Sequence, residues 1–97
     1  MFTSKQRSNL RSIASTLEPI MQVGKGGVSD NMIESLALAI EKRELVKISV
    51  LQNADDTAEG YALVLAKAVG AEVVAVIGKK IILYKRSDKQ GVKHIEF

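Results

Sequence analysis

Hydrophobic residues recur at intervals of three and four positions near the amino terminus. The members of this stripe are Leu10, Ile13, Ala14 and Leu17. The spacing is that of one helix face and predicts a helix over residues 4–17. Thr3 or Ser4 can cap its start, and Pro19 ends it because proline cannot continue a helix.

Two later stretches have the same helical periodicity. Ser29 is suited to cap the first of them, with Asp30 in its first turn. The expected stripe of this helix is Ile33, Leu36, Ala37 and Ile40. The second stretch begins with Asp56 and Glu59, whose spacing of three residues has the pattern of a capping box. Its expected core residues are Ala58, Tyr61, Ala62, Leu65 and Val69, and Gly70 should end it.

Four shorter stretches have the composition of β-strands. The first, residues 20–23, runs into a cluster of glycines. Residues 45–51 alternate Val46, Ile48 and Val50 with Leu45, Lys47 and Ser49, which predicts a strand with one well-buried face. Residues 72–77 and 80–84 are joined by Gly78-Lys79, which is suited to a two-residue hairpin turn.

The predicted order is therefore α-β-α-β-α-β-β. We expect an α/β (α+β) two-layer sandwich with a four-stranded mixed sheet. A chain of 97 residues is too short for a second core, so residues 1–97 should form one domain. Its core should span about residues 3–86. Residues 87–97 lack apolar periodicity and are expected to form a flexible tail.

The composition excludes several classes of chemistry. The chain has no cysteine, which rules out disulfides, thiol catalysis and cysteine-based zinc sites. No apolar run has the length of a membrane span or the character of a signal peptide. We therefore expect a cytoplasmic protein without a membrane partner.

No catalytic constellation is visible. The one histidine, His94, lies in the expected tail. Asp55 and Asp56 are adjacent at a helix start, where side chains one residue apart do not face each other, so helix capping accounts for them better than acid–base chemistry. We expect no enzymatic activity, cofactor, metal or small-molecule substrate.

The segment Gly24-Lys25-Gly26-Gly27 is a candidate phosphate-binding loop. It lacks the Lys-Ser/Thr pair of a Walker A loop, and Ser29 occupies the position where a dinucleotide fingerprint has glycine. What remains is a glycine-x-x-glycine loop before a helix, where phosphates can approach backbone N–H groups. The alternative is a tight turn that needs positive φ.

Positive charge is concentrated toward the two ends of the sequence. The net charge is +3 overall, made up of +2 in residues 1–30, −2 in residues 31–70 and +3 in residues 71–97. In the first helix Lys5, Arg7 and Arg11 occupy the amino-terminal turns, where the helix dipole disfavours cations. Arg7 and Arg11 share one flank, which favours a phosphate-bearing partner.

Several short motifs follow one another along the chain: Ser4-Lys5-Gln6 with Leu10, Ala14, Leu17 and Pro19; residues 24–27; Arg43-Glu44-Leu45-Val46-Lys47; Gly70-Ala71; Val76-Ile77-Gly78-Lys79; and Leu83-Tyr84. Taken in order, this set resembles the CRM domain (chloroplast RNA splicing and ribosome maturation) in its single-domain bacterial YhbY-like form. Val69 and Lys85 depart from the family pattern but keep size or charge.

The resemblance implies a fold like the C-terminal domain of translation initiation factor 3, with a GxxG loop used as in KH domains. It also implies a role in large ribosomal subunit assembly, with ribosomal RNA in precursor subunits as the partner. The candidate RNA contacts are Lys5, Arg7, Arg11, Gly24, Lys25, Gly26, Gly27, Lys47, Lys79, Lys85 and Arg86. We expect the helix residues to flank the loop, in a monomeric protein.

Two other functions remain open from the residues alone. One is a DNA-binding architectural protein, which competition between RNA and duplex DNA would distinguish. The other is a protein-interaction adaptor that docks through Leu63 and Val64 of the apolar third helix.

Overall fold

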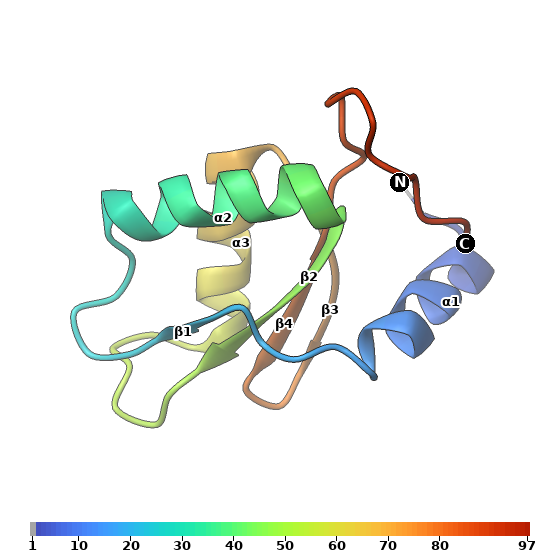
Figure 1. The fold of residues 1–97 in the computed structure, drawn as a ribbon. Helices are drawn as coiled ribbons and strands as arrows, with labels where there is room; N and C mark the ends of the chain where they lie inside the picture. The colour runs from blue at the N-terminus through green and yellow to red at the C-terminus, as the bar shows by residue number, and fades with distance from the viewer. Residues whose placement is uncertain (1) are drawn as a thin grey trace.

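The structure, a computed structural model, describes residues 2–97. Helices and strands follow each other in the predicted order (Figure 1). They are α1 (Ser4–Ala14), β1 (Met21–Val23), α2 (Asp30–Arg43), β2 (Leu45–Val50), α3 (Ala58–Val69), β3 (Glu72–Ile77) and β4 (Lys80–Tyr84).

The strands form one mixed sheet in the order β1-β2-β4-β3. β1 is parallel to β2, which the α2 crossover makes possible, and the other two pairs are antiparallel. The carboxyl-terminal ends of β1 and β2 therefore lie at the same end of the sheet as the β3–β4 hairpin turn. The predicted four-stranded mixed sheet is confirmed.

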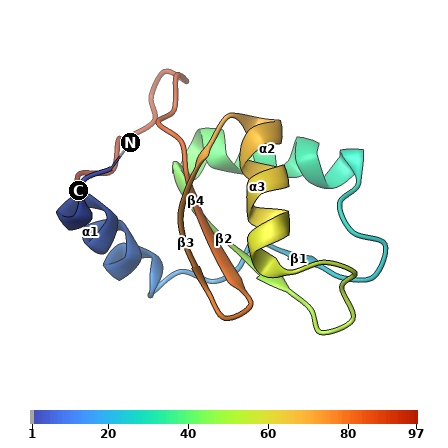
Figure 2. The same ribbon diagram turned by 180° about the vertical axis from the view of Figure 1, so that it is seen from behind.

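Helices cover both faces of this sheet (Figures 1 and 2). Under α2 and α3 lies the larger core, which includes Leu36, Ile40, Val46, Ile48, Leu65, Ile81 and Leu83. On the opposite face Leu10 and Ala14 of α1 pack against Leu45, Val74, Ile82 and Tyr84. Helix α1 thus adds a layer to the expected two-layer sandwich. The prediction that β2 has one buried face was wrong, because Leu45 and Val46 are 2% and 1% exposed.

Capping explains most of the helix boundaries. Thr3 caps α1 in a reciprocal capping box with Gln6, and Gly70 ends α3 in the left-handed conformation at φ 71°. Helix α1 ends at Ala14, earlier than the expected Leu17, and continues as a turn. The capping box predicted for Asp56 and Glu59 was wrong.

Thr57 is the cap of α3. Its side chain accepts a hydrogen bond from the N–H of Gly60 at 3.1 Å. Asp56 accepts from the N–H of Thr57 at 2.7 Å, outside the first helical turn. The sequence pattern placed the cap one residue early because aspartate and threonine are both good caps.

Residues 87–97, expected to be a flexible tail, pack on the domain around Glu44. This glutamate follows α2 in a positive-φ conformation (62°), and its side chain is fully buried. The carboxylate accepts from the N–H groups of Ser87 at 2.7 Å and Ile95 at 2.8 Å, and lies 2.6 Å from Nδ1 of His94. Burial alone would raise the pKa of Glu44, but these hydrogen bonds together hold it below its ordinary value.

Aromatic rings then join the two ends of the chain. The rings of Phe2 and Phe97 are 5.7 Å apart, and that of Tyr84 lies 5.0 Å from Phe97, both in edge-on geometry. Sequence periodicity missed this segment because its anchors are one buried carboxylate and three scattered rings, which have no regular spacing.

Candidate nucleic-acid interface

The glycine loop is a tight turn between β1 and α2. The N–H of Gly27 donates to the carbonyl of Gly24 at 3.1 Å, which closes the turn. Gly26 and Gly27 have φ of 95° and 71°, values that residues with a side chain rarely adopt. Ser29 then caps α2 as predicted, accepting from the N–H of Met32 at 3.2 Å.

This loop packs against the segment between β2 and α3 and against α3 itself. A β-carbon at Gly24 would lie 3.2 Å from Cδ1 of Leu51, and one at Gly27 would lie 3.6 Å from the hydroxyl oxygen of Tyr61. Close approach and positive φ therefore account for three glycines by backbone geometry. This was the alternative left open from the sequence, and it does not exclude phosphate binding.

The tip of the loop is open to solvent. Lys25 and Gly26 are exposed, and nothing lies within 4 Å of the position that a β-carbon of Gly26 would take. The tip stands before the amino terminus of α2, where unpaired N–H groups and the helix dipole favour anions. It therefore offers the N–H of Gly26 and one mobile cation, the Lys25 ammonium, to a phosphate group.

A carboxylate borders the same loop. Oδ2 of Asp55 accepts from the N–H of Gly26 at 3.4 Å. The interpretation of Asp55 as a helix cap was therefore wrong, since its partner lies in the loop that precedes α2. The local charge is mixed rather than uniformly basic.

The basic residues of α1 lie elsewhere. Helix α1 and the β1–α2 loop are on opposite sides of the molecule in both views (Figures 1 and 2). The expectation that Lys5, Arg7 and Arg11 flank the loop was wrong, because α1 packs on the sheet face away from α2. Lys5 and Arg11 are nevertheless exposed and form part of the surface of α1.

Arg7 has a structural role that the sequence did not indicate. Its guanidinium donates to the carbonyl of Val73 at 2.9 Å and also to that of Val74. These carbonyls lie where the β3–β4 register shifts between Val73 and Ala75. A β-bulge interrupts the ladder locally, and Arg7 donates to two carbonyls at this point.

The residues expected to make the outer RNA contacts differ in how free they are to do so. Lys79 lies exposed in the β3–β4 turn, and Arg86 is exposed after β4. Lys85 pairs with Glu41 at 3.2 Å, and this hydrogen bond is the main reason that the pKa of Glu41 is lowered. Lys85 is thus partly neutralised.

A polar row crosses the sheet on the α1 side, near the end that carries the glycine loop. The register places Gln22, Ser49 and Lys80 side by side on β1, β2 and β4. Nζ of Lys80 donates to Oγ of Ser49 at 2.9 Å, and Gln22 and Lys80 are exposed. Lys47 lies on the same face, two residues before Ser49. The alternation of residues along β2 predicted that Lys47 and Ser49 share this face, but Lys80 was not among the predicted contacts.

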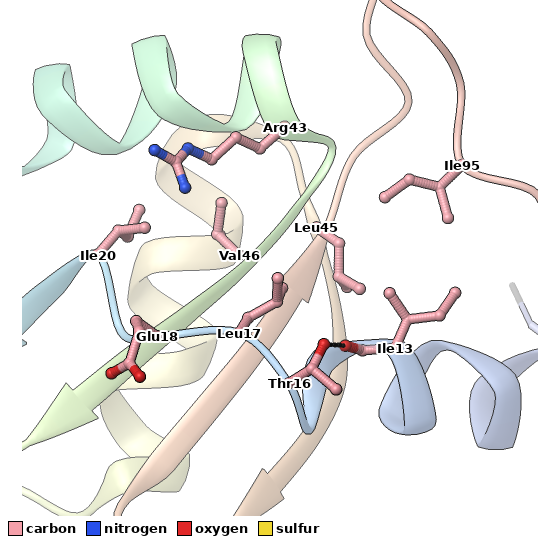
Figure 3. Close-up of a pocket in the computed structure, with 9 residues that line it drawn as sticks. All are labelled: Ile13, Thr16, Leu17, Glu18, Ile20, Arg43, Leu45, Val46 and Ile95. Atoms are coloured by element: carbon pink, nitrogen blue, oxygen red, sulfur yellow. Dashed lines mark hydrogen bonds between the residues drawn. The ribbon is translucent and has the colours of Figure 1, made fainter.

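A cavity of about 440 Å³ lies between the end of α1, the end of α2 and the start of β2 (Figure 3). Its lining is mostly apolar, with Glu18 and Arg43 as its charged members. The hydroxyl of Thr16 donates to the carbonyl of Ile13, so it is not paired with a base. The lining thus holds no nucleophile with an activating partner.

Residues 2–97 contain neither a membrane-spanning helix nor a cluster of metal-ligating side chains. None of the helices there is long and apolar enough to cross a membrane. Within the same residues, no group of three or more histidine and acidic side chains is placed to hold a metal ion.

The sequence model of the CRS1 / YhbY (CRM) domain matches residues 2–85. The chain belongs to this family. Probable RNA-binding protein YqeI of Bacillus subtilis is 50% identical over 96 residues, which cover 99% of this chain and 98% of YqeI. Probable RNA-binding protein MJ0652 of Methanocaldococcus jannaschii is 38% identical over 86% of this chain and 63% of its own length.

The fold comparison agrees with the family assignment. The solution structure of hypothetical protein SAV1595 from Staphylococcus aureus, considered a candidate RNA-binding protein, superimposes with a TM-score of 0.77. It is 43% identical, and the match covers 93% of this chain and 94% of SAV1595. The CRM resemblance seen in the motifs is thereby confirmed, and these relatives are named for RNA binding rather than for a reaction.

Proposed function

We propose that this protein binds structured RNA through its phosphate backbone and acts in the cytoplasm as a monomeric factor for large ribosomal subunit assembly. The observation that carries the proposal is the exposed Lys25-Gly26 tip before α2, in a chain whose CRM relatives are named RNA-binding proteins. A phosphate at this tip would accept hydrogen bonds from backbone N–H groups. The positive end of the α2 dipole and the Lys25 ammonium would stabilise its negative charge.

The placement of the aromatic residues supports backbone recognition over base stacking. Tyr61 and Tyr84 are 7% and 8% exposed, and Phe2 and Phe97 pack with Tyr84. Proteins that read single-stranded RNA present aromatic rings as stacking platforms. Without such a platform, RNA shape and phosphate positions are the features left to recognise.

We propose further contacts on two surfaces. Lys79 and Lys80 lie at the same end of the sheet as the loop and can extend the phosphate track, with Lys47 behind them. Lys5, Arg11 and Arg86 are exposed away from the loop, so they would contact a separate segment of a folded RNA.

The test is a salt titration with a structured fragment of large-subunit ribosomal RNA. Lys25→Asp should weaken binding and lower the slope of log affinity against log salt by roughly 0.7–0.9, because one phosphate contact is lost. Lys89→Asp makes the same charge change at an exposed position in the carboxyl-terminal segment and is the control. An amide NMR spectrum establishes that each variant is folded.

The outcomes separate the possibilities. If folded Lys25→Asp has the slope of Lys89→Asp, the loop is not the RNA contact and its glycines serve the turn. If duplex DNA binds as tightly as RNA, the architectural DNA-binding function replaces this one. The assembly role requires that the protein co-sediment with precursor large subunits, and failure to do so would overturn it.

One observation favours the adaptor function as a second candidate. Leu38 on α2 is 68% exposed, and Leu63 and Val64 on α3 are 69% and 51% exposed. Single exposed apolar residues are normal, whereas a docking surface needs exposed apolar residues that adjoin, as Leu63 and Val64 do in sequence. A protein complex that resists salt and is lost in Leu63→Ser, in a chain that fails to bind RNA, would favour this function.

A further inference from the structure

Two adjacent carboxylates between β2 and α3 have different partners. Asp56 is turned toward α3, where it accepts from the N–H of Thr57 at 2.7 Å. Asp55 is turned toward the glycine loop, where Oδ2 accepts from the N–H of Gly26 at 3.4 Å. The hydrogen bond therefore spans 29 positions of sequence and joins an exposed carboxylate to the loop tip.

Gly26 is the residue that a phosphate at the tip would meet. Its φ of 95° sets the direction of its N–H, and the space on its β-carbon side is empty. A carboxylate oxygen and a phosphate oxygen are both anionic acceptors, so they compete for one donor. We propose that Asp55 is a built-in competitor for RNA phosphate at the Gly26 N–H, and that RNA binds by displacing it. This inference rests on the proposed function of the loop.

Displacement requires that Asp55 be free to leave. Asp55 is exposed, and among residues 2–97 its side chain makes no other hydrogen bond or ion pair. It can therefore rotate into solvent without disturbing either core. Until it does, it satisfies the Gly26 donor and repels an incoming phosphate, so RNA binds more weakly than the loop alone would allow.

The experiment compares three single variants with wild type on the same ribosomal RNA fragment at fixed salt. Asp55→Ala removes both the charge and the acceptor, whereas Asp55→Asn removes the charge and keeps an acceptor oxygen. Asp56→Asn removes one charge from the same segment without freeing Gly26, which makes it the matched control. Circular dichroism verifies that α3 is intact in each.

Asp55→Ala should bind RNA about two- to tenfold more tightly than Asp56→Asn, the change expected from one hydrogen bond released to the ligand. Asp55→Asn should lie between them. Inorganic phosphate should also move the Gly26 amide resonance at lower concentration in Asp55→Ala than in wild type. Both results would support displacement at this donor.

Equal affinities for the three variants would overturn the competitor role, because removal of charge alone would then explain the gain. If Lys25→Asp weakens binding while Asp55→Ala matches Asp56→Asn, the loop still binds RNA and only the role of Asp55 fails. If Lys25→Asp also has no effect, the loop assignment fails together with the competitor.

Discussion

Glu44→Ala tests how the carboxyl-terminal segment is held. The substitution removes a fully buried carboxylate that accepts from the N–H groups of Ser87 and Ile95 and contacts His94. Alanine keeps a β-carbon, so the strain of φ 62° at this position stays nearly the same in both proteins. The difference in stability therefore reports the carboxylate.

The magnitude follows from the number and kind of the contacts. A hydrogen bond to a charged group contributes about 1.5–3 kcal/mol, and three bonds to one carboxylate are not additive. Once the segment detaches, its N–H groups regain water, so we expect a loss of roughly 2–4 kcal/mol. In a domain of this size such a loss lowers Tm by roughly 10–25 °C. The core should still fold, because a typical domain has about 5–15 kcal/mol to lose.

Urea unfolding followed by circular dichroism measures the loss, and amide hydrogen exchange locates it. The amides of Ser87 and Ile95 should lose protection before those of β2 and β4. Glu34→Ala, earlier in α2, removes an exposed carboxylate that has no partner in the carboxyl-terminal segment and is the control; its effect should be far smaller. Equal urea midpoints for the two variants would refute the buried carboxylate as the anchor, as would unchanged protection in the segment.

Two further predictions follow from the same contacts. The pKa of Glu44 is lowered on folding, so its stabilising contribution is present above the ordinary carboxyl pKa of 4.5 and is lost as the pH falls through the lowered pKa. Glu44→Gln should therefore flatten the acid side of a curve of Tm against pH. A curve unchanged from wild type would contradict this prediction. Arg7→Ala should lose about 1–3 kcal/mol in urea unfolding, because two bulge carbonyls lose their donor. Arg11→Ala should change the free energy of unfolding by no more than about 0.5 kcal/mol. Equal losses of stability in the two variants would show that Arg7 is only a surface cation.

Local sequence signals predicted most of the elements because their physical causes are local. Ser29 precedes the stripe of α2, Gly70 supplies the left-handed cap of α3, and Gly78-Lys79 forms the hairpin turn. Each depends on residues within one or two turns of chain. The family motifs extended this local information to the whole domain.

The predictions that were wrong depend on partners distant in sequence. Arg7 bonds to β3, 66 and 67 residues later, and Glu44 holds groups 43 to 51 residues later. Arg7 was therefore interpreted as a surface cation, and the segment around His94 as a flexible tail. A pattern of charges shows neither which cation is used inside the fold nor which carboxylate is buried.

The charge distribution illustrates the same limit at the site. The two basic ends of the sequence do meet, but they meet through Phe2, Tyr84 and Phe97, with the guanidinium of Arg7 5.6 Å from the Phe2 ring centre. Meanwhile the glycine loop lies against Asp55 from the acidic middle of the chain. Which charges become neighbours is decided by topology, and in particular by the parallel pairing of β1 with β2.

Strand β2 separates the anchor of the carboxyl-terminal segment from the proposed RNA-binding loop. Glu44 immediately precedes it and anchors the carboxyl-terminal segment, whereas Leu51 follows it and packs toward the glycine loop at the other end. Lys25, Gly26 and Asp55 are exposed and belong to neither core. If the loop binds RNA as proposed, changes there should alter RNA affinity in a folded protein. A change at Arg7 removes fold contacts and surface charge together, so lost RNA binding in an Arg7 variant would not by itself assign α1 to the interface.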